Sequence, residues 1–354
     1  MVRGGGVATR LRLRTALVCA VIAALAMVGT VWALMLGAYP ISLSQIWAAL
    51  IDGPDAGFAR TVVVDWRAPR AVAALIFGAA LGASGAVFQS LTRNPLASPD
   101  IIGFSAGSFT GALVVIILIH GTYLQLAAGA ILGGIATAAA VYLLAWRRGV
   151  QGFRLIIVGI GISAMLGSFN TWLMLNAELE VAMSAAVWGA GSLNGTSWDQ
   201  VLYGGTLVVL LLAGIAGLSP GLRQLELGDD VAKATGIRAE PVRLGLMVLG
   251  VALVAVVTAA AGPISFIALA APQIARRIAR TPGVTVAPAA VTGALLLVAA
   301  DLIAQHALPV VLPVGVVTVV IGGAYPVWLI IREVRRGSPG MSRSVPAPVE
   351  GARP

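Results

Sequence analysis

Long apolar segments alternate with short polar ones along most of the chain, which has 354 residues. An α-helix needs about 20 apolar residues to cross a bilayer core of about 30 Å. Ten segments come close to that length, near residues 15–37, 71–91, 101–119, 124–146, 155–175, 201–218, 242–262, 264–280, 285–304 and 308–331. The pattern therefore predicts an all-α, polytopic integral membrane protein with about ten transmembrane helices.

The eighth segment, 264–280, is the weakest of the ten. Pro263 and Pro272 interrupt it, and Gln273 and Arg276 make its second half polar. Hydropathy alone therefore also allows nine helices.

The basic residues decide between nine helices and ten. With ten, both termini lie on one side of the membrane, and that side carries 20 of the 23 basic residues. Only Arg60, Arg67 and Arg70 fall on the opposite side. Cytoplasmic loops are enriched in Lys and Arg, so the charge pattern favours ten helices with both termini in the cytoplasm.

The composition agrees with a membrane protein and excludes several other classes. Hydrophobic residues make up 59% and charged residues 10% of the chain, whereas soluble domains carry about 25% charged residues. The net charge of +9 is spread over short segments between apolar runs, which indicates topology rather than nucleic-acid binding. Cys19 is the only cysteine, so the chain cannot build a disulfide, a zinc-thiolate site or an iron–sulfur site.

The pattern divides the chain into three parts. Residues 1–14 form a basic cytoplasmic N-terminus, and the apolar run that follows is longer than a signal-peptide core and has no A-x-A site, which predicts an uncleaved first helix. Residues 15–331 form the membrane domain, with a cytoplasmic segment at about 219–241. Residues 332–354, rich in Pro, Ser and Gly, are predicted to be a disordered cytoplasmic tail.

Two motifs of enzymes are absent or out of context. Gly103, Ser105 and Gly107 match the G-x-S-x-G pattern of serine hydrolases, but that nucleophile needs a preceding strand, and here the motif opens an apolar helix. The only lysine, Lys233, lies between two alanines, so the chain has no Walker A loop. We predict no enzyme activity; any ATP hydrolysis would belong to a separate subunit.

The predicted helices carry very few ionisable residues, which argues against a carrier coupled to protons or sodium. Asp301 and His306 lie near the outer end of the ninth helix. They are interpreted either as interfacial anchors or as functional groups.

Small residues recur at helical spacing within the predicted spans, as in Gly78-x-x-x-Gly82-x-x-Gly85 and Gly103-x-x-x-Gly107. Such residues let helix backbones approach closely in lipid. They are expected at helix crossings, with or without a role in transport.

Two polar segments stand out. Arg67-Ala68-Pro69-Arg70 lies at the outer end of the second helix and is interpreted either as a cationic docking site for a soluble protein or as a pair of snorkelling anchors. On the inner side, Leu225–Ile237 reads LELGDDVAKATGI. Its alternating apolar and charged residues predict a compact amphipathic knob, able to enter a groove on a partner, or a solvated loop.

These residues together resemble the FecCD or vitamin B12 type of ABC importer permease, a family that carries iron siderophores, haem and cobalamin. The resemblance covers about residues 30–332. It rests on Arg67–Arg70, Gly78–Gly85, Gln89, the run Arg93-Asn94-Pro95-Leu96-Ala97-Ser98-Pro99, Gly103-x-Ser105-x-Gly107, Leu227-Gly228, Gly262–Ile267, Pro272–Arg276 and Leu312–Gly315. It is strongest to the second permease of ferric enterobactin systems.

The resemblance implies a transporter of two permease subunits, two cytoplasmic ATPases that bind ATP and Mg²⁺, and an extracytoplasmic binding protein. It implies no cofactor and no metal on this chain. It assigns Arg67 and Arg70 to docking of the binding protein. It assigns ATPase coupling to Leu227, Gly228, Asp229, Asp230, Ala232, Lys233 and Gly236. It assigns the translocation path and helix packing to Gly78, Gly82, Gly85, Gln89, Asn94, Pro95, Gly103, Ser105, Gly107, Gly262, Pro263, Pro272, Gln273, Arg276, Pro313 and Gly315.

Three positions depart from the family pattern. Gln273 stands where the family often has His, Val311 where it often has Glu, and Gln305 where an Arg is common. The expected function is a permease subunit of the inner (plasma) membrane that moves a ferric siderophore, favouring an enterobactin-like catecholate, by alternating access. The alternatives are a haem or cobalamin importer, an ion-coupled carrier and a membrane enzyme. A heterodimer with a second permease is favoured over a homodimer.

Overall fold

The computed structural model describes residues 2–4, 7–9, 13–51, 57–146, 152–283 and 285–324. The predicted tail, 332–354, and the last part of the predicted membrane domain, 325–331, lie outside the described residues. In the predicted basic N-terminus, strands β1 (Val2–Gly4) and β2 (Val7–Thr9) pair as a short antiparallel hairpin.

The described helices follow the predicted apolar segments closely. Seven of them are long and apolar enough to cross a membrane: α1 (Leu13–Met35), the continuous run of α3 (Phe58–Arg60), η2 (Thr61–Arg67) and α4 (Ala68–Thr92), α6 (Tyr123–Ala145), α7 (Gly152–Leu175), α9 (Trp198–Glu226), α11 (Ala239–Ala261) and α13 (Val286–His306). The prediction of an all-α membrane protein is confirmed apart from the N-terminal hairpin.

Three shorter helices account for the remaining predicted spans. They are α5 (Phe104–Val114) with its continuation η3 (Val115–Ile119), α12 (Ile267–Ala279), and the helix Val314–Ala324. With the seven long helices they make the predicted number of about ten. The eighth predicted helix is shorter than its apolar segment because Gly262–Phe266 is not helical.

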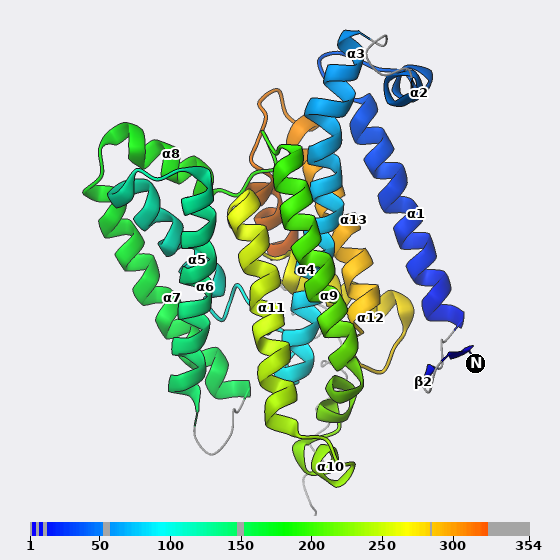
Figure 1. Ribbon diagram of the computed structural model, residues 1–354, viewed down its shortest axis with the longest axis vertical. Helices are drawn as coiled ribbons and strands as arrows, with labels where there is room; N and C mark the ends of the chain where they lie inside the picture. Colours follow the sequence, from blue (N-terminus) through cyan, green and yellow to red (C-terminus); the bar gives the residue numbers. More distant parts are fainter. Residues whose placement is uncertain are drawn as a thin grey trace, which may run out of the picture.

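Several short helices do not correspond to an apolar run of spanning length. Helices α2 (Leu43–Ile51) and α8 (Leu179–Gly189) lie at one end of the bundle together with α3, and α10 (Asp229–Ala234) lies at the other end (Figure 1). The start of α1 lies at the same end as α10. The charge pattern places that end in the cytoplasm, so we call it the inner end.

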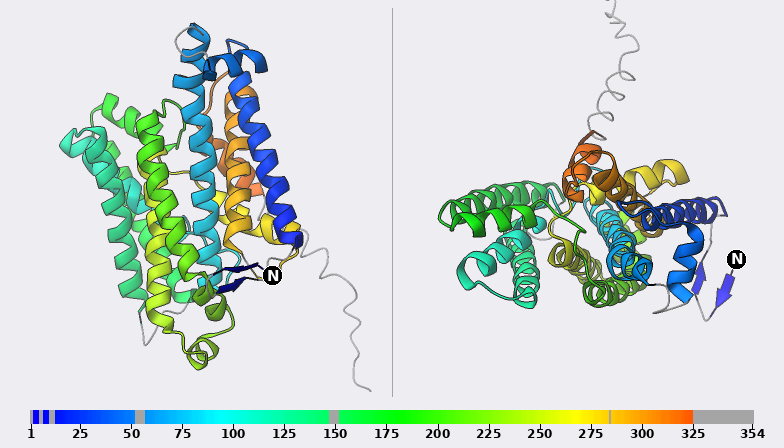
Figure 2. Two further views of the ribbon diagram at one scale, coloured as in Figure 1. Left: turned by 45° about the vertical axis from the view of Figure 1, so that its right-hand side comes forward. Right: turned by 90° about the horizontal axis from the view of Figure 1, so that it is seen from above.

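Helix α4 lies at the centre of the larger part of the bundle. Helices α9, α11, α12 and α13 all contact it, while α1 packs mainly on α13. Helices α5 to α8 form a second group that contacts the first mainly through α11 (Figures 1 and 2). The buried side chains of α4, including Phe77 and Leu81, join those of α9, α11 and α13 in one apolar core.

Glycines allow the central helices to touch through their backbones. A Cβ at Gly78 would lie 2.5 Å from the carbonyl oxygen of Gly293 in α13, and a Cβ at Gly82 would also meet the α13 backbone, at Ala289. About one turn beyond Gly82, Gly85 lies against the backbone of Ala268 in α12. Side chains would separate these helices, and in lipid no hydrophobic effect between helices would compensate.

Candidate functional site

The inner tip of the bundle is a compact turn built around α10. Gly228, which precedes the helix, has φ 118° and ψ 153°, a conformation open essentially to glycine alone. Gly236 ends it with φ 81°, and the amides of Gly236 and Ile237 donate to the carbonyls of Lys233 and Ala232, a Schellman motif. The segment is thus a defined knob.

The knob has one face buried against the bundle and one face exposed to solvent. Ala232 is fully buried against Leu225 and Ala239, which fixes α10 to the ends of α9 and α11. Leu227, 68% exposed, and Val231, 43% exposed, instead point into solvent beside the exposed charges of Asp230 and Lys233. The tip of the bundle thus carries two exposed apolar side chains.

The side chain of Asp229 is 40% exposed and binds the bundle through two arginines. Its Oδ1 accepts hydrogen bonds from Arg243 Nη2 at 2.7 Å and from Arg93 Nη2 at 3.1 Å. Arg243, at the start of α11 and only 6% exposed, also donates to Glu240 Oε1 at 2.7 Å. Asp229 and Asp230, which the sequence alone does not distinguish, therefore have different surroundings.

Arg93 opens the segment that joins α4 to α5, here called the central loop (residues 93–103). In Figure 1 this loop crosses from α4 to the second group of helices within the height of the bundle. Asn94 Oδ1 accepts the amide of Leu96 at 2.9 Å, and Ala97, Ser98 and Ile102 are almost fully buried. Pro95 is exposed at the inner side.

Asp100 lies at the far end of the central loop. Ser105 Oγ donates to its Oδ1 at 2.5 Å, while its Oδ2 is buried without a hydrogen-bond partner among the described residues. Burial raises the pKa of Asp100 to about 6, although the Ser105 hydroxyl and the backbone of Phe266 stabilise its charged form. Asp100 was not predicted as a site residue, because its only signal in the sequence is a lone acid between Pro99 and an apolar helix.

Two glycines bring α5 against its neighbours. Gly103, with φ 96°, lies where a Cβ would meet Ser163 Oγ of α7 at 2.5 Å. A Cβ at Gly107 would lie 2.8 Å from the carbonyl oxygen of Gly133 in α6 and would also overlap Thr137. Ser105 is buried between them. These motif residues therefore lie at helix crossings, where a hydrolytic nucleophile would be inaccessible.

Helix α12 begins inside the bundle. Gly262 and Pro263 start the non-helical stretch, and Phe266 ends it in the left-handed region with φ 68°, which is unusual for a bulky residue. Pro272 is buried inside α12, whereas Arg276 is exposed near its inner end.

A buried amide pair ties α12 to α4. Gln273 Nε2 donates to Gln89 Oε1 at 2.5 Å, and Gln89 Nε2 donates to the carbonyl of Leu269 at 3.0 Å. Both glutamines are at most 6% exposed. The glutamine that replaces the family's frequent histidine thus belongs to a helix contact.

Three non-helical stretches meet toward the outer half of the bundle. The amide of Gly315 donates to the carbonyl of Gly191 at 2.9 Å, and that of Ser192 donates to Ala261 at 2.7 Å. A Cβ at Gly315 or at Gly262 would overlap the backbone around α8. Pro313 starts the helix Val314–Ala324 at this junction.

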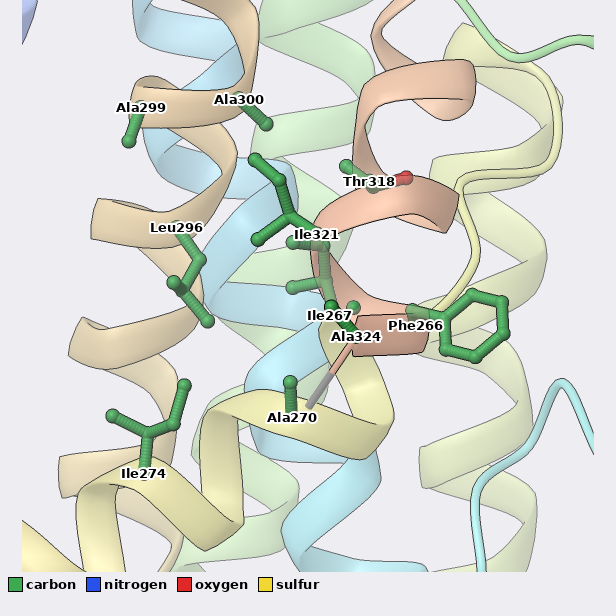
Figure 3. Close-up of a pocket in the computed structure, with 11 residues that line it drawn as sticks. Phe266, Ile267, Ala270, Ile274, Leu296, Ala299, Ala300, Thr318, Ile321 and Ala324 are labelled. Atoms are coloured by element: carbon green, nitrogen blue, oxygen red, sulfur yellow. The ribbon is translucent and has the colours of Figure 1, made fainter. Parts of the chain in front are cut away.

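An apolar cavity of about 370 Å³ lies between α12, α13 and the helix Val314–Ala324. Figure 3 shows Ile274 and Leu296 pointing into this space beside Ile321, while the ring of Phe266 points away from α13. The start of α12 is therefore loosely packed on this side.

At the outer end, both arginines of the Arg67–Arg70 motif have partners within the chain. Arg67 donates from Nη1 to the carbonyl of Leu34 at 2.8 Å and from Nη2 to that of Tyr39 at 2.7 Å, so it caps the end of α1. Arg70 forms a two-pronged ion pair with Asp301, with distances of 2.9 and 2.8 Å to Oδ2. Asp301 is therefore a buried partner of Arg70.

Helix α7 is exposed over most of its surface. Gly161, Ala164, Ser168 and Thr171 form an exposed stripe of small residues along it. Such a stripe favours close approach of another helix over contact with lipid.

The structure thus separates the predicted residues into three places: the inner knob, the outer arginines, and the helix crossings and loops between them. The contacts of Asp229 with Arg93 and Arg243 were not predictable from the sequence, because they join separate segments of the chain. Among the described residues, no three His, Cys, Asp or Glu side chains lie close enough to hold a metal ion.

Comparison with known proteins gives consistent results. The model of the FecCD transport family matches residues 15–332. The chain is 49% identical to the ferric enterobactin transport system permease protein FepG of Escherichia coli (strain K12), over 91% of this chain and 98% of that protein. It is 35% identical to the achromobactin transport system permease protein CbrC of Dickeya dadantii (strain 3937), over 92% and 91% respectively.

The fold also matches a solved structure. A metal-chelate type ABC transporter in an inward-facing conformation superimposes with a TM-score of 0.78 at 26% identity, over 90% of this chain and 99% of that one.

Proposed function

The chain belongs to the FecCD transport family, and on this basis we propose that it is the permease subunit of an ATP-driven importer for a ferric siderophore of the enterobactin type. It is a multi-pass protein of the inner (plasma) membrane. The observation that carries the proposal is the 49% identity to the ferric enterobactin permease across 98% of that protein. Haem and cobalamin are the alternative cargoes.

The described spanning helices offer little for ion-coupled transport. Their buried acid, Asp301, is neutralised by Arg70. The acid of the central loop, Asp100, lies outside these helices and is bound by Ser105. Carriers driven by protons or sodium use unpaired ionisable groups at depth. The energy is therefore assigned to a separate ATPase subunit, which binds ATP and Mg²⁺, while this chain binds no cofactor.

The knob around α10 is the proposed contact with the ATPase. Its exposed Leu227 and Val231, with Asp230 and Lys233 beside them, form a small apolar surface with a charged rim. Protein interfaces have this composition. The buried Ala232 anchors the knob, so force applied at the tip reaches α9 and α11.

The stripe on α7 is the proposed contact with the second permease subunit and with the cargo path between the two subunits. The path is thus assigned to smooth, uncharged helix surfaces. An importer must release its cargo, and such surfaces bind it weakly. A heterodimer with a different permease is favoured over a homodimer.

The outer end is the proposed docking site of the binding protein. Arg67 and Arg70 are held in place by α1 and α13, and Arg70 keeps 22% of its side chain exposed. Preoriented arginines can receive acidic side chains without a further loss of rotamer entropy. The binding protein would then deliver the ferric chelate to an outward-facing cavity, and ATP-driven movement of the knob would open the inner side.

Uptake of radiolabelled ferric enterobactin tests the function. Cells that lack this chain should lose uptake, and cells with the chain restored should regain it. Labelled cobalamin and haem, measured in parallel, should enter both kinds of cell equally. Loss and rescue of cobalamin or haem uptake alone would assign the chain to another branch of the family, and rescue without an active ATPase partner would refute an ATP-driven importer.

The change Leu227→Asp tests the ATPase contact. Because Leu227 is exposed, the permease should fold normally, whereas a charge in an apolar hot spot should cost about 2 kcal/mol of binding, roughly a thirtyfold rise in the Kd for the ATPase. Binding of the purified subunits in detergent measures this. Leu308→Asp, at a 55% exposed leucine of the outer end, is the matched control and should leave the Kd unchanged. Equal affinity for Leu227→Asp would place the contact elsewhere.

A further inference from the structure

Asp229 and Asp230 are neighbours, yet only Asp229 is bound to the bundle. Asp230 is exposed and forms no ion pair with a described residue. Asp229 joins Arg93 to Arg243, and Arg243 is held in turn by Glu240. Movement of the knob must therefore move Arg93 or break its ion pair.

The Arg93–Asp229 pair is expected to contribute little to the stability of the fold. Its side chains are 51% and 40% exposed and their atoms lie 3.1 Å apart, and exposed ion pairs contribute little to the free energy of unfolding. The chain nevertheless places Arg93 in the left-handed region, with φ 51°, where its side chain reaches the knob.

The central loop that begins at Arg93 is held together by internal hydrogen bonds. The amide of Ala97 donates to Asn94, that of Ile102 to Ser98, and that of Phe104 to Pro99, all at 3.1 Å. Ile102 and Phe104 are buried, and Phe104 packs on Phe88 of α4. A loop with this many internal contacts moves as a unit rather than absorbing a displacement at one end.

We propose that Arg93 is a positioning residue that transmits movement of the knob, through Asp229, to the central loop. The inference rests on the proposed function and adds to it a route from the ATPase contact to the interior of the bundle. It assigns opposite tasks to two adjacent acids: Asp230 faces the partner, and Asp229 faces the permease.

The test uses the complete transporter in proteoliposomes, with its ATPase, its partner permease and the binding protein loaded with ferric enterobactin. ATP hydrolysis and ferric enterobactin transport are measured on the same vesicles. In Arg93→Ala, hydrolysis should stay within about twofold while transport per ATP falls roughly tenfold. Arg93→Lys should recover most of the transport, and the unfolding temperature of both variants should match that of the unmodified transporter.

A double-mutant cycle tests the pairing. If Arg93 acts through Asp229, Asp229→Ala should lower transport per ATP as far as Arg93→Ala does, and the double variant should be no worse than either single variant. Arg14→Ala, at an exposed arginine of the same end of the bundle, is the control and should change neither measurement.

The outcomes separate this inference from the proposed function. Normal transport per ATP in Arg93→Ala, or additive losses in the cycle, would overturn the inference while the proposed function stands. Failure of the unmodified transporter to move ferric enterobactin with ATP would refute the proposed cargo and the inference together.

Discussion

Alanine at position 85 should prevent α12 from packing on α4 and should abolish uptake. A Cβ there would lie 2.6 Å from the carbonyl carbon of Ala268 and 2.9 Å from its Cα, and would overlap its oxygen. These are backbone atoms of a buried helix, so relief requires the helices to separate. Overpacking of this kind costs about 1–3 kcal/mol or more, and separation would also break the bonds of Gln89 to Gln273 and Leu269.

Folded yield and thermal unfolding in detergent measure the effect of Gly85→Ala. Gly217→Ala is the matched control, because a Cβ at Gly217 in α9 has nothing within 4 Å. The control should keep its yield and its unfolding temperature. A Gly85→Ala protein with the unfolding temperature of the unmodified chain would mean that α4 and α12 cross less closely than the structure shows.

The helices of the fold were predictable because a segment that crosses lipid must be apolar over about 20 residues, and hydropathy measures this directly. The start of α12 was not, because Gly262–Phe266 is apolar and reads as part of a span, although its backbone is not helical. Such backbone is tolerated at membrane depth only inside protein, and a single sequence does not show which neighbours enclose it. The prolines at 263 and 272 marked the segment as irregular without showing where its helix begins.

The conformation of the knob was predictable where residue type alone limits it. Gly228 and Gly236 bracketed the knob in the sequence, and both have positive φ. The tertiary contacts were not predictable in the same way. Nothing local distinguishes Asp229 from Asp230, and the partner of Arg70 lies 231 residues away. The sequence therefore located charged groups but left open which of them form ion pairs within the bundle.

The last prediction concerns the ion pair of Arg70 and Asp301. Replacing only one of the two residues should destabilise the chain more than replacing both. Asp301 is 4% exposed and accepts hydrogen bonds from Nε and Nη2 of Arg70. Asp301→Ala leaves the arginine charge partly buried without a partner, a loss of about 3–5 kcal/mol. Replacing both residues by apolar ones, as Arg70→Met with Asp301→Leu, should restore most of that stability, because burying a pair of charges is itself costly.

The double variant also separates packing from docking. The unfolding temperature should drop by several degrees in Asp301→Ala and recover in the double variant. It should remain unchanged in the control Asp65→Ala, which replaces an exposed aspartate of the same outer end. If Arg70 also receives the binding protein, the stable double variant should bind it more weakly at low salt, and the difference should shrink as salt screens the charges. Unchanged affinity at low salt would make Arg70 a purely internal partner of Asp301, and would leave Arg67 as the remaining candidate for docking.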